Sequence, residues 1–477
     1  MKKLAILFFV CLFAAFGCIG AASLAVHTDK DQVTVTEKTL KGDPSAAQGL
    51  VARQTARNLN FQWDLTIPLG DLASTTAQAT AAKDVPQDDL LPAWVQDNYF
   101  TIDLTHSMGV GGEPGFTLKD LRTGNALNDP VMAPILEDVG SRTPLGGSYT
   151  EKISPQDYGM TYYPVKIRMN LAGVEWTDES WNAMQKAFQN YFRFPIPEDA
   201  QWTVTIEKDM KGLFTKLDVK APSCNGVNVP FAVSQNSLFF AVDSGGEWSL
   251  PSFAQVKDGY GIYRLDLTAQ ADGTRTPDLA SLRMVHPLDP AGTILDLTWD
   301  EGNQRLLLTD YQDGAYTCTT FDPETMAVQQ TLSLPGDKPQ KRTVDGYTFT
   351  EYAGYRCWAG DNFLLFRGKD GFLLFDENLD GSYTHRFTGQ LPEESIGLDP
   401  ADTVIVWNGE TLAIGQTSII PGLRLMVYNA DGQLLYHGIY RTSLNESGSL
   451  PGDETKAGVS EEDVRLLPSQ PLTLSWE

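Results

Sequence analysis

Residues 361–387 read DNFLLFRGKDGFLLFDENLDGSYTHRF, and this stretch decides the fold class. Its short apolar and aromatic runs are separated by two Asp-Gly pairs, Asp370-Gly371 and Asp380-Gly381. Gly, and Asp more than most residues, tolerates the positive φ angles that tight hairpin turns need. The stretch therefore predicts a meander of short antiparallel strands.

The same turn recurs through the C-terminal half of the chain. Strand-like runs flank Asp313-Gly314, Asp370-Gly371 and Asp431-Gly432, and a looser copy lies at Asp258-Gly259, so that successive turns are about 55–61 residues apart. A repeat of this length, made of short strands, fits a β-propeller blade of about four antiparallel strands. Such sheets cover each other's apolar faces when they stand around a common axis.

The predicted fold class is all-β with minor helices, as a β-propeller of about seven blades; the alternative is a multi-sheet β-sandwich. Regular repeats are expected over 228–441, after an irregular N-terminal half. A closing strand at 471–476 is expected to complete a sheet begun by the N-terminal residues. The predicted domains are a signal or membrane-anchor segment at 1–30 and a propeller-like extracytoplasmic domain at 31–477.

The most clearly marked helix is predicted over 178–192, and a short one is expected within 130–139. Thr177 is a suitable N-cap, and the acidic first turn suits the positive end of the helix dipole. An apolar stripe follows at helical spacing, formed by Trp181, Met184, Phe188 and Tyr191. Residues 71–89, which are small, polar and aperiodic, and residues 145–158 are predicted to be loops.

The N-terminus carries an export signal. Lys2 and Lys3 precede an uncharged apolar run, Leu4–Val26, which is long enough to span a bilayer. The favoured interpretation is a retained anchor with the lysines on the cytoplasmic side. Cleavage after Ser23-Leu24-Ala25 and lipidation at Cys18 are the alternatives; the lipobox-like Ala15-Phe16-Gly17-Cys18 lacks the usual Leu. All three place the body of the chain outside the cytoplasm.

The net charge excludes one class of partner. The chain has 36 basic and 61 acidic residues, a net charge of −25, and an isoelectric point near 4.5. Binding to a phosphate backbone needs clustered Lys and Arg, so nucleic acid is not an expected partner. Outside the leader the cysteines are Cys224, Cys318 and Cys357, whose spacing predicts neither a disulfide framework nor a zinc site.

Four Asp-Leu-Thr triplets, each after an apolar or aromatic residue, are the strongest candidates for catalytic carboxylates. They begin at Asp64, Asp103, Asp266 and Asp296. One interpretation is a ring of carboxylates around a channel, since glycosidases need paired acids. The favoured interpretation is strand alternation, in which each Leu is buried and the flanking Asp and Thr face water.

A partial calcium motif overlaps one of the turns. Residues 376–381, DENLDG, match the first half of an EF-hand loop through Asp376, Asn378 and Asp380, but Phe387 stands where the bidentate Glu is required. An EF-hand is therefore excluded, while a looser calcium site and a plain hairpin turn remain open. No metal or cofactor residue is assigned.

No nucleotide, serine-hydrolase or zinc-protease motif is present, and the five histidines are scattered. No catalytic residue is assigned, and an enzyme is disfavoured. The anchor-like segment and the Asp-Gly repeat resemble extracytoplasmic, membrane-tethered β-propeller-like repeat proteins of bacteria. The resemblance implies a binding or scaffold protein that presents loops to a protein or glycan ligand. The alternative function is a secreted carbohydrate-active enzyme with carboxylates at the propeller channel.

Overall fold

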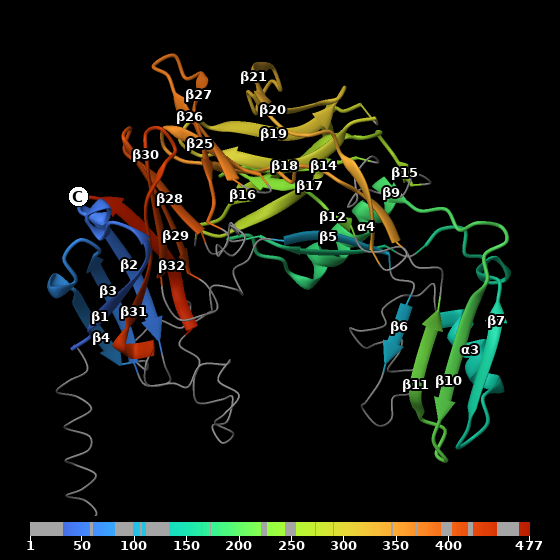
Figure 1. Cartoon of the computed structure of the whole chain (residues 1–477). Helices are drawn as coiled ribbons and strands as arrows, with labels where there is room; N and C mark the ends of the chain where they lie inside the picture. Colours follow the sequence, from blue (N-terminus) through green and yellow to red (C-terminus); the bar gives the residue numbers. More distant parts are fainter. Residues whose placement is uncertain are drawn as a thin grey trace, which may run out of the picture. The chain divides into compact units, whose positions relative to one another are not determined.

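The computed structural model describes sixteen ranges of the chain: residues 32–57, 61–81, 99–104, 107–110, 133–163, 165–171, 173–220, 227–243, 254–271, 273–289, 291–344, 347–368, 371–392, 403–417, 423–445 and 467–477. Within them antiparallel strands dominate, and the α-helices are α3 (Ala133–Arg142) and α4 (Asp178–Tyr191) (Figure 1). The predicted all-β class with minor helices is confirmed. The leader at 1–30 lies outside these ranges. No helix within them has the length and hydropathy to cross a bilayer.

The chain divides into two compact units. The first unit combines residues 1–97 with 358–477, and the second comprises residues 98–357. Both are built mainly from antiparallel sheets of up to five strands, the blade-like elements that the repeat predicts. The number of blades and the closure of a ring remain predictions.

The described residues of the first unit form three sheets. In hydrogen-bonded order, they are β32 (Leu467–Trp476), β2 (Leu50–Arg57), β3 (Phe61–Pro68) and β4 (Thr76–Ala81); β1 (Val35–Gly42), β31 (Leu434–Thr442), β30 (Leu423–Asn429), β29 (Thr411–Thr417) and β28 (Thr403–Trp407); and β24 (Arg356–Ala359), β25 (Phe363–Arg367), β26 (Gly371–Glu377) and β27 (Tyr383–Gln390).

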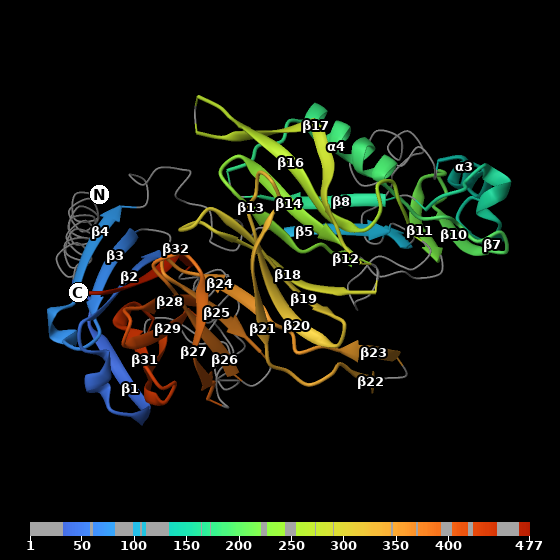
Figure 2. The same ribbon diagram turned by 90° about the horizontal axis from the view of Figure 1, so that it is seen from above.

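Strands from the two ends of the chain pair twice in this unit. The C-terminal β32 pairs with β2 in a register running from Leu50↔Trp476 to Arg57↔Leu467, and Figures 1 and 2 show the red strand beside the blue one. β1 pairs with β31 at the edge of the second sheet. Leu472 and Leu474 of β32 are buried in a core shared with β2 and β3. The first unit therefore depends on the last residues of the chain.

The second unit contains the remaining described sheets. In hydrogen-bonded order, they are β12 (Val227–Asn228), β5 (Tyr99–Leu104) and β8 (Val165–Asn170); β6 (Ser107–Val110), β11 (Phe214–Lys220), β10 (Trp202–Lys208) and β7 (Ser148–Ile153); β13 (Phe231–Val233), β14 (Ser237–Val242), β16 (Gly261–Ala269) and β17 (Arg275–Pro287); β15 (Gln255–Val256) and β9 (Phe192–Arg193); β18 (Thr293–Asp300), β19 (Arg305–Gln312), β20 (Ala315–Phe321) and β21 (Val328–Leu334); and β22 (Gln340–Val344) and β23 (Tyr347–Glu351).

Asp313-Gly314 and Asp431-Gly432 form tight hairpins at different positions in their sheets, whereas Asp258-Gly259 lies between β15 and β16, which belong to different sheets. Asp313 and Gly314 have φ angles of 53° and 82°, the two positive values of a type I′ turn, and they join the second strand of their sheet to the third. Asp431-Gly432 instead joins β30 to β31, the fourth and fifth strands of their sheet in chain order. The predicted alignment of the repeat is therefore wrong at its last copy, because Asp-Gly marks any tight hairpin.

Two segments predicted to be loops form strands. Residues 76–81 form the edge strand β4, and residues 148–153 form β7, which pairs with β10. By contrast, α4 runs over the segment for which a helix is predicted. Its Thr177 cap accepts a hydrogen bond from the Ser180 backbone N–H, and Met184 and Phe188 are buried beneath it.

Candidate functional site

The four triplet aspartates lie on strands, as predicted, and Asp266 and Asp296, whose side chains are described in the second unit, have separate sets of partners. Asp64 is exposed on β3, next to the buried Leu65, and accepts a hydrogen bond from Thr55 Oγ1 at 3.1 Å. Asp103 lies on β5, and its side chain lies outside the described part of the chain. Asp266 lies on β16 and Asp296 on β18; each has its own set of structural contacts.

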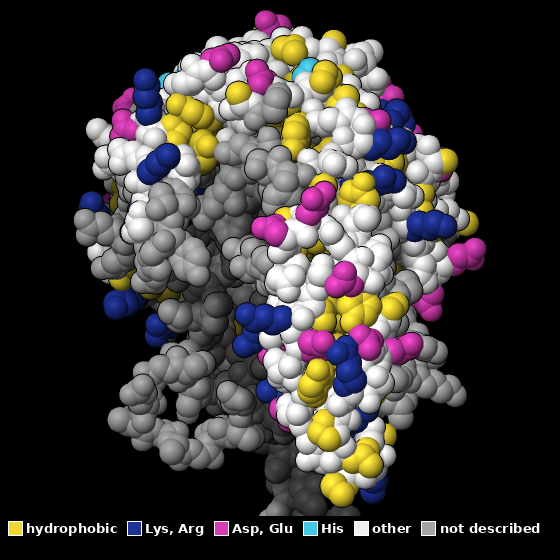
Figure 3. All heavy atoms as spheres, turned by 90° about the vertical axis from the view of Figure 1, so that its right-hand side faces the viewer, with side chains coloured by type: hydrophobic (Ala, Val, Ile, Leu, Met, Phe, Trp, Pro, Cys, Tyr) yellow, Lys and Arg dark blue, Asp and Glu magenta, His cyan; other side chains and the backbone are white. Residues whose placement is uncertain are grey.

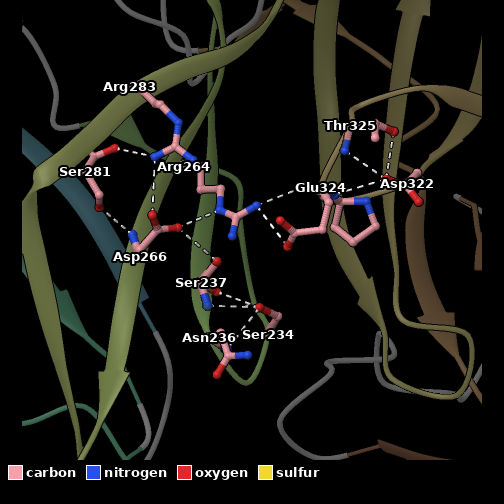
Figure 4. Close-up of polar contacts among 11 residues, drawn as sticks. Ser234, Asn236, Ser237, Arg264, Asp266, Ser281, Arg283, Asp322, Glu324 and Thr325 are labelled. Carbon is pink, nitrogen blue, oxygen red and sulfur yellow. Dashed lines mark hydrogen bonds and ion pairs between the residues drawn. The ribbon is translucent and has the colours of Figure 1, made fainter.

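Asp266 is held by two arginines (Figure 4). Its Oδ1 accepts from Arg264 Nε at 2.6 Å, and its Oδ2 accepts from Arg283 Nη1 at 3.3 Å. Its backbone N–H donates to Ser281 Oγ at 2.8 Å. Burial opposes ionisation of this carboxyl, but the arginines outweigh it and lower the pKa of Asp266. A carboxylate stabilised in its charged form is a poor general acid.

Arg264 ties two sheets together. Its side chain is only 11% exposed, and its guanidinium lies 5.6 Å from the centroid of the Phe239 ring, which stacks on Trp299. Its Nη1 donates to the Pro323 carbonyl and to the Glu324 carboxylate, both at 3.1 Å, in the turn between β20 and β21. Asp266 and Arg264 therefore have a structural role: they connect the paired strands β14 and β16 to the β20–β21 hairpin.

Asp296 and Asp243 are buried acceptors for backbone N–H groups. Asp296 Oδ2 accepts from the Cys357 N–H at 2.8 Å, and Oδ1 lies 3.6 Å from Arg356 Nη1. Burial raises the pKa of Asp296 against the opposing charge of Arg356. Asp243, which directly follows β14, accepts from the Ile294 N–H at 2.7 Å. Burial raises the pKa of Asp243 to about 6, although that hydrogen bond opposes the shift.

The raised pKa of Asp243 predicts a pH dependence of stability. The folded state holds this proton more tightly than the unfolded chain, whose Asp has a pKa near 3.8. Stability is therefore lost as the pH rises from about 4 to about 6 and is level above that. At about 1.4 kcal/mol per pKa unit, the loss is on the order of 2–3 kcal/mol. D243N should remove this slope.

Urea unfolding of the wild type and D243N at pH 4, 5, 6 and 7 measures the difference. The diagnostic quantity is the slope with pH, because the Asn side-chain NH2 adds a constant cost of its own. D64N, at an exposed carboxylate, is the control and should keep the wild-type slope. Parallel curves for D243N and the wild type would contradict the assignment.

Residues 376–381, the partial calcium motif, span the end of β26 and the turn that leads to β27. Asp376 Oδ1 accepts from Trp407 Nε1 at 2.6 Å. Asp380 Oδ1 accepts from the backbone N–H and the hydroxyl of Ser382, at 2.9 and 2.6 Å. These contacts make a hairpin turn and an anchor for Trp407. Over the described ranges, the structure brings no three His, Cys, Asp or Glu side chains into a metal-binding group.

Cys318 and Cys357 are buried free thiols, as their spacing indicated. Burial raises the pKa of both above the ordinary thiol value. Such thiols are protonated at neutral pH and are poor nucleophiles.

A surface groove of about 530 Å³ lies where α3, β7 and the short 3-10 helix η6 (Pro155–Tyr158) meet, and we call it the α3 groove. It was not predicted from the sequence. Its lining is polar and charged and consists of Asp138, Arg142, Glu151, Lys152, Ile153, Ser154, Asp157, Tyr158 and Gln201.

A chain of four side chains crosses the α3 groove. Asp138 and Arg142 lie one helical turn apart at the C-terminal end of α3, where the helix dipole favours a cation. Arg142 donates to Glu151 Oε1 and to Asp138 Oδ2, each at 2.6 Å, and the Tyr158 hydroxyl also donates to Asp138 Oδ2. Burial and this hydrogen bond raise the pKa of Tyr158 to about 12.

Packing holds these side chains in place. Ile135, Leu136 and Val139 of α3 are buried in the main core of the second unit, which leaves Asp138 and Arg142 on the outer side. The Arg142 guanidinium lies 5.7 Å from the centroid of the Tyr149 ring on β7. The α3 groove therefore presents prearranged polar groups on a helix and a strand, not on a loose loop.

Comparison with known proteins gives distant structural likenesses. No protein-family model matches the sequence, and no curated protein matches it significantly. The chain is similar to a periplasmic gluconolactonase from Pseudomonas aeruginosa, with 14% identity over 51% of this chain and 64% of the other and a TM-score of 0.23. It thus covers less than two-thirds of that protein.

Two further solved structures are similar at the same level. TolB from Acinetobacter baumannii is 10% identical over 82% of this chain and 79% of TolB, with a TM-score of 0.23. The β-propeller domain of Cps50 (Swd1) from Myceliophthora thermophila is 10% identical over 50% of this chain and 82% of that domain, also with a TM-score of 0.23. These TM-scores are low, and the fold is defined by the sheets themselves.

Proposed function

We propose that this protein is a non-enzymatic binding protein of the extracytoplasmic space and that the α3 groove is its contact surface. The observation that carries the proposal is the prearranged chain Glu151–Arg142–Asp138–Tyr158 in an open surface groove. Small-molecule sites are typically concave, with volumes of roughly 300–1,000 Å³, and use a few fixed polar groups to orient the ligand; most have a more apolar lining than the α3 groove. A helix and a strand hold these groups more rigidly than loops would.

The contacts of the candidate carboxylates favour binding over hydrolysis. A glycosidase needs two carboxyl groups that face one substrate from about 5–10 Å apart. Asp266 is paired with two arginines, and Asp296 accepts a backbone N–H beside Arg356. Asp64 lies in the other unit, on the solvent side of β3. These contacts support structural roles for the three aspartates.

The face drawn in Figure 3 is also of the mixed type that suits a binding protein. Figure 3 shows the face on which α3 and β7 lie, and acidic and basic side chains are interspersed on it with apolar ones. Such a surface provides both hydrogen-bond donors and acceptors to a partner.

The extracytoplasmic location rests on Lys2, Lys3 and the apolar run Leu4–Val26. Protease treatment of intact cells should release peptides of the body of the chain. Mass spectrometry of the mature N-terminus should distinguish a retained anchor from cleavage after Ala25 or lipidation at Cys18. Protection of the body in intact cells, with digestion only after lysis, would place it in the cytoplasm and overturn the location.

Binding is tested with the full-length protein in mild detergent. Panels of oligosaccharides and peptides are screened by biolayer interferometry against the wild type and D138N. We expect at least one ligand class whose binding weakens about tenfold or more in D138N. The same preparation should show no turnover of chromogenic glycosides. Turnover that D266N or D296N abolishes would establish the alternative, a carbohydrate-active enzyme.

A further inference from the structure

We infer that the α3 groove binds a neutral, hydroxyl-rich ligand, a short saccharide. This inference rests on the proposed binding function and names the ligand class. The starting point is the internal charge balance of the groove. Arg142 lies between the carboxylates of Glu151 and Asp138, at 2.6 Å from each. Most of the charge on the floor of the groove is therefore neutralised before any ligand arrives.

The residual charge disfavours ionic ligands of either sign. An anion would meet the carboxylates of Asp138 and Asp157, opposed by Lys152, on a chain whose net charge is −25. A cation would have to sit beside the Arg142 guanidinium, which already occupies the position between the two acids. Two like unit charges about 4 Å apart repel each other by about 1 kcal/mol in water and by more at a protein surface. A neutral ligand avoids both costs.

The hydrogen-bonding groups match hydroxyls. A sugar hydroxyl both donates and accepts, so it suits a surface that offers both kinds of group. Asp138 and Asp157 offer carboxylate acceptors, Lys152 offers a donor, and Gln201 offers both. The Tyr158 hydroxyl donates to Asp138, which leaves its oxygen able to accept from a ligand. The polar, shallow lining is unsuited to an apolar molecule, which needs an enclosed apolar pocket.

Fixed geometry makes weak but specific binding feasible. Two hydrogen bonds to Asp138, from Arg142 and Tyr158, orient its carboxylate, so a sugar need not order it. A shallow groove of this size has room for a short oligosaccharide. Because most hydroxyls would remain in water, we expect a dissociation constant on the order of 0.1–1 mM.

Saturation-transfer NMR and titration calorimetry with the full-length protein test the inference. The probes are neutral hexose and N-acetylhexosamine trisaccharides, trilysine as the cation, and trigalacturonate as the anion. We expect a neutral trisaccharide to bind, D138N to weaken it about tenfold or more, and Y158F to weaken it about threefold to tenfold. D218N on β11, at a carboxylate paired only loosely with Lys220 at 3.9 Å, should bind like the wild type.

The outcomes separate this inference from the proposed function. Binding of trilysine or trigalacturonate that D138N abolishes, without saccharide binding, would overturn the ligand class and leave the groove as a binding site. Saccharide binding that neither D138N nor Y158F changes would overturn the groove as the site. Each variant must have the same circular dichroism spectrum and the same thermal unfolding curve as the wild type. Y158F, which removes one oxygen, serves if D138N is misfolded.

Discussion

A chain that ends at Ser469 should unfold its first unit at temperatures at which the intact protein remains folded. The truncation removes most of the paired part of β32, including Leu472 and Leu474, and exposes the edge of β2. Each buried Leu contributes about 2–5 kcal/mol when truncated to Ala. The total loss should be at least about 5 kcal/mol, which is comparable with the net stability of a domain. Differential scanning calorimetry measures the effect.

A graded pair of substitutions checks the same strand. Leu474 is 6% exposed, whereas its neighbour Thr473 faces solvent. L474A should cost about 2–4 kcal/mol in urea unfolding, and T473A should stay within about 0.5 kcal/mol of the wild type. Equal effects of the two variants, or an unchanged melting profile of the truncated chain, would show that β32 is dispensable.

G42A should have the second large effect, a loss of about 3 kcal/mol or more. Gly42 ends β1 with a φ of +81°, and a Cβ atom there would lie 1.9 Å from the backbone carbonyl oxygen of Leu435. The left-handed conformation costs a non-glycine residue about 1–2 kcal/mol. The clash with backbone adds an overpacking cost of about 1–3 kcal/mol, because β31 has to move away.

Gly409 provides the matched control in the same unit. Its φ is +93°, but nothing lies within 4 Å of the position that a Cβ would take. G409A should therefore show only the conformational cost, about 1–2 kcal/mol. Chemical unfolding of the two variants side by side isolates the clash. If G42A is no less stable than G409A, the close approach of β1 to β31 is not as described.

The sequence predicts the class of fold because its signals are local. The positive φ angles at Asp313-Gly314 and the alternating runs beside them are properties of neighbouring residues. The strand β4 was missed because the apolar positions of its alternating sequence, TAQATA, are all Ala, whose small side chains give a weak strand signal and are only half-buried at this edge of the sheet. β7 was missed for a similar reason: of its six residues, only Ile153 is fully buried.

The candidate site was harder to predict because its contacts are distant in sequence or lie in weakly patterned segments. The predicted strand alternation is supported at Asp64, where the neighbouring Leu65 is buried and the Asp is exposed. It is wrong at Asp296, whose side chain is only 14% exposed because it accepts the Cys357 N–H. Asp243 carries one local signal, its position directly after the wholly buried run of β14. The α3 groove forms where α3, β7 and η6 lie side by side, and no spacing pattern in those segments predicts that they do.

The pairing of β32 with β2 means that the sheets of the first unit can be completed only after the end of the chain has been synthesised. The N-terminal strands β1 to β4 are made first, yet β31 and β32, which complete their sheets, are made only after the whole of residues 98–357. The middle unit can fold on the ribosome while the early strands still have exposed edges, and such edges invite aggregation. We expect nascent chains to need a holding chaperone until their last residues emerge, and a bulky C-terminal fusion to delay that final step.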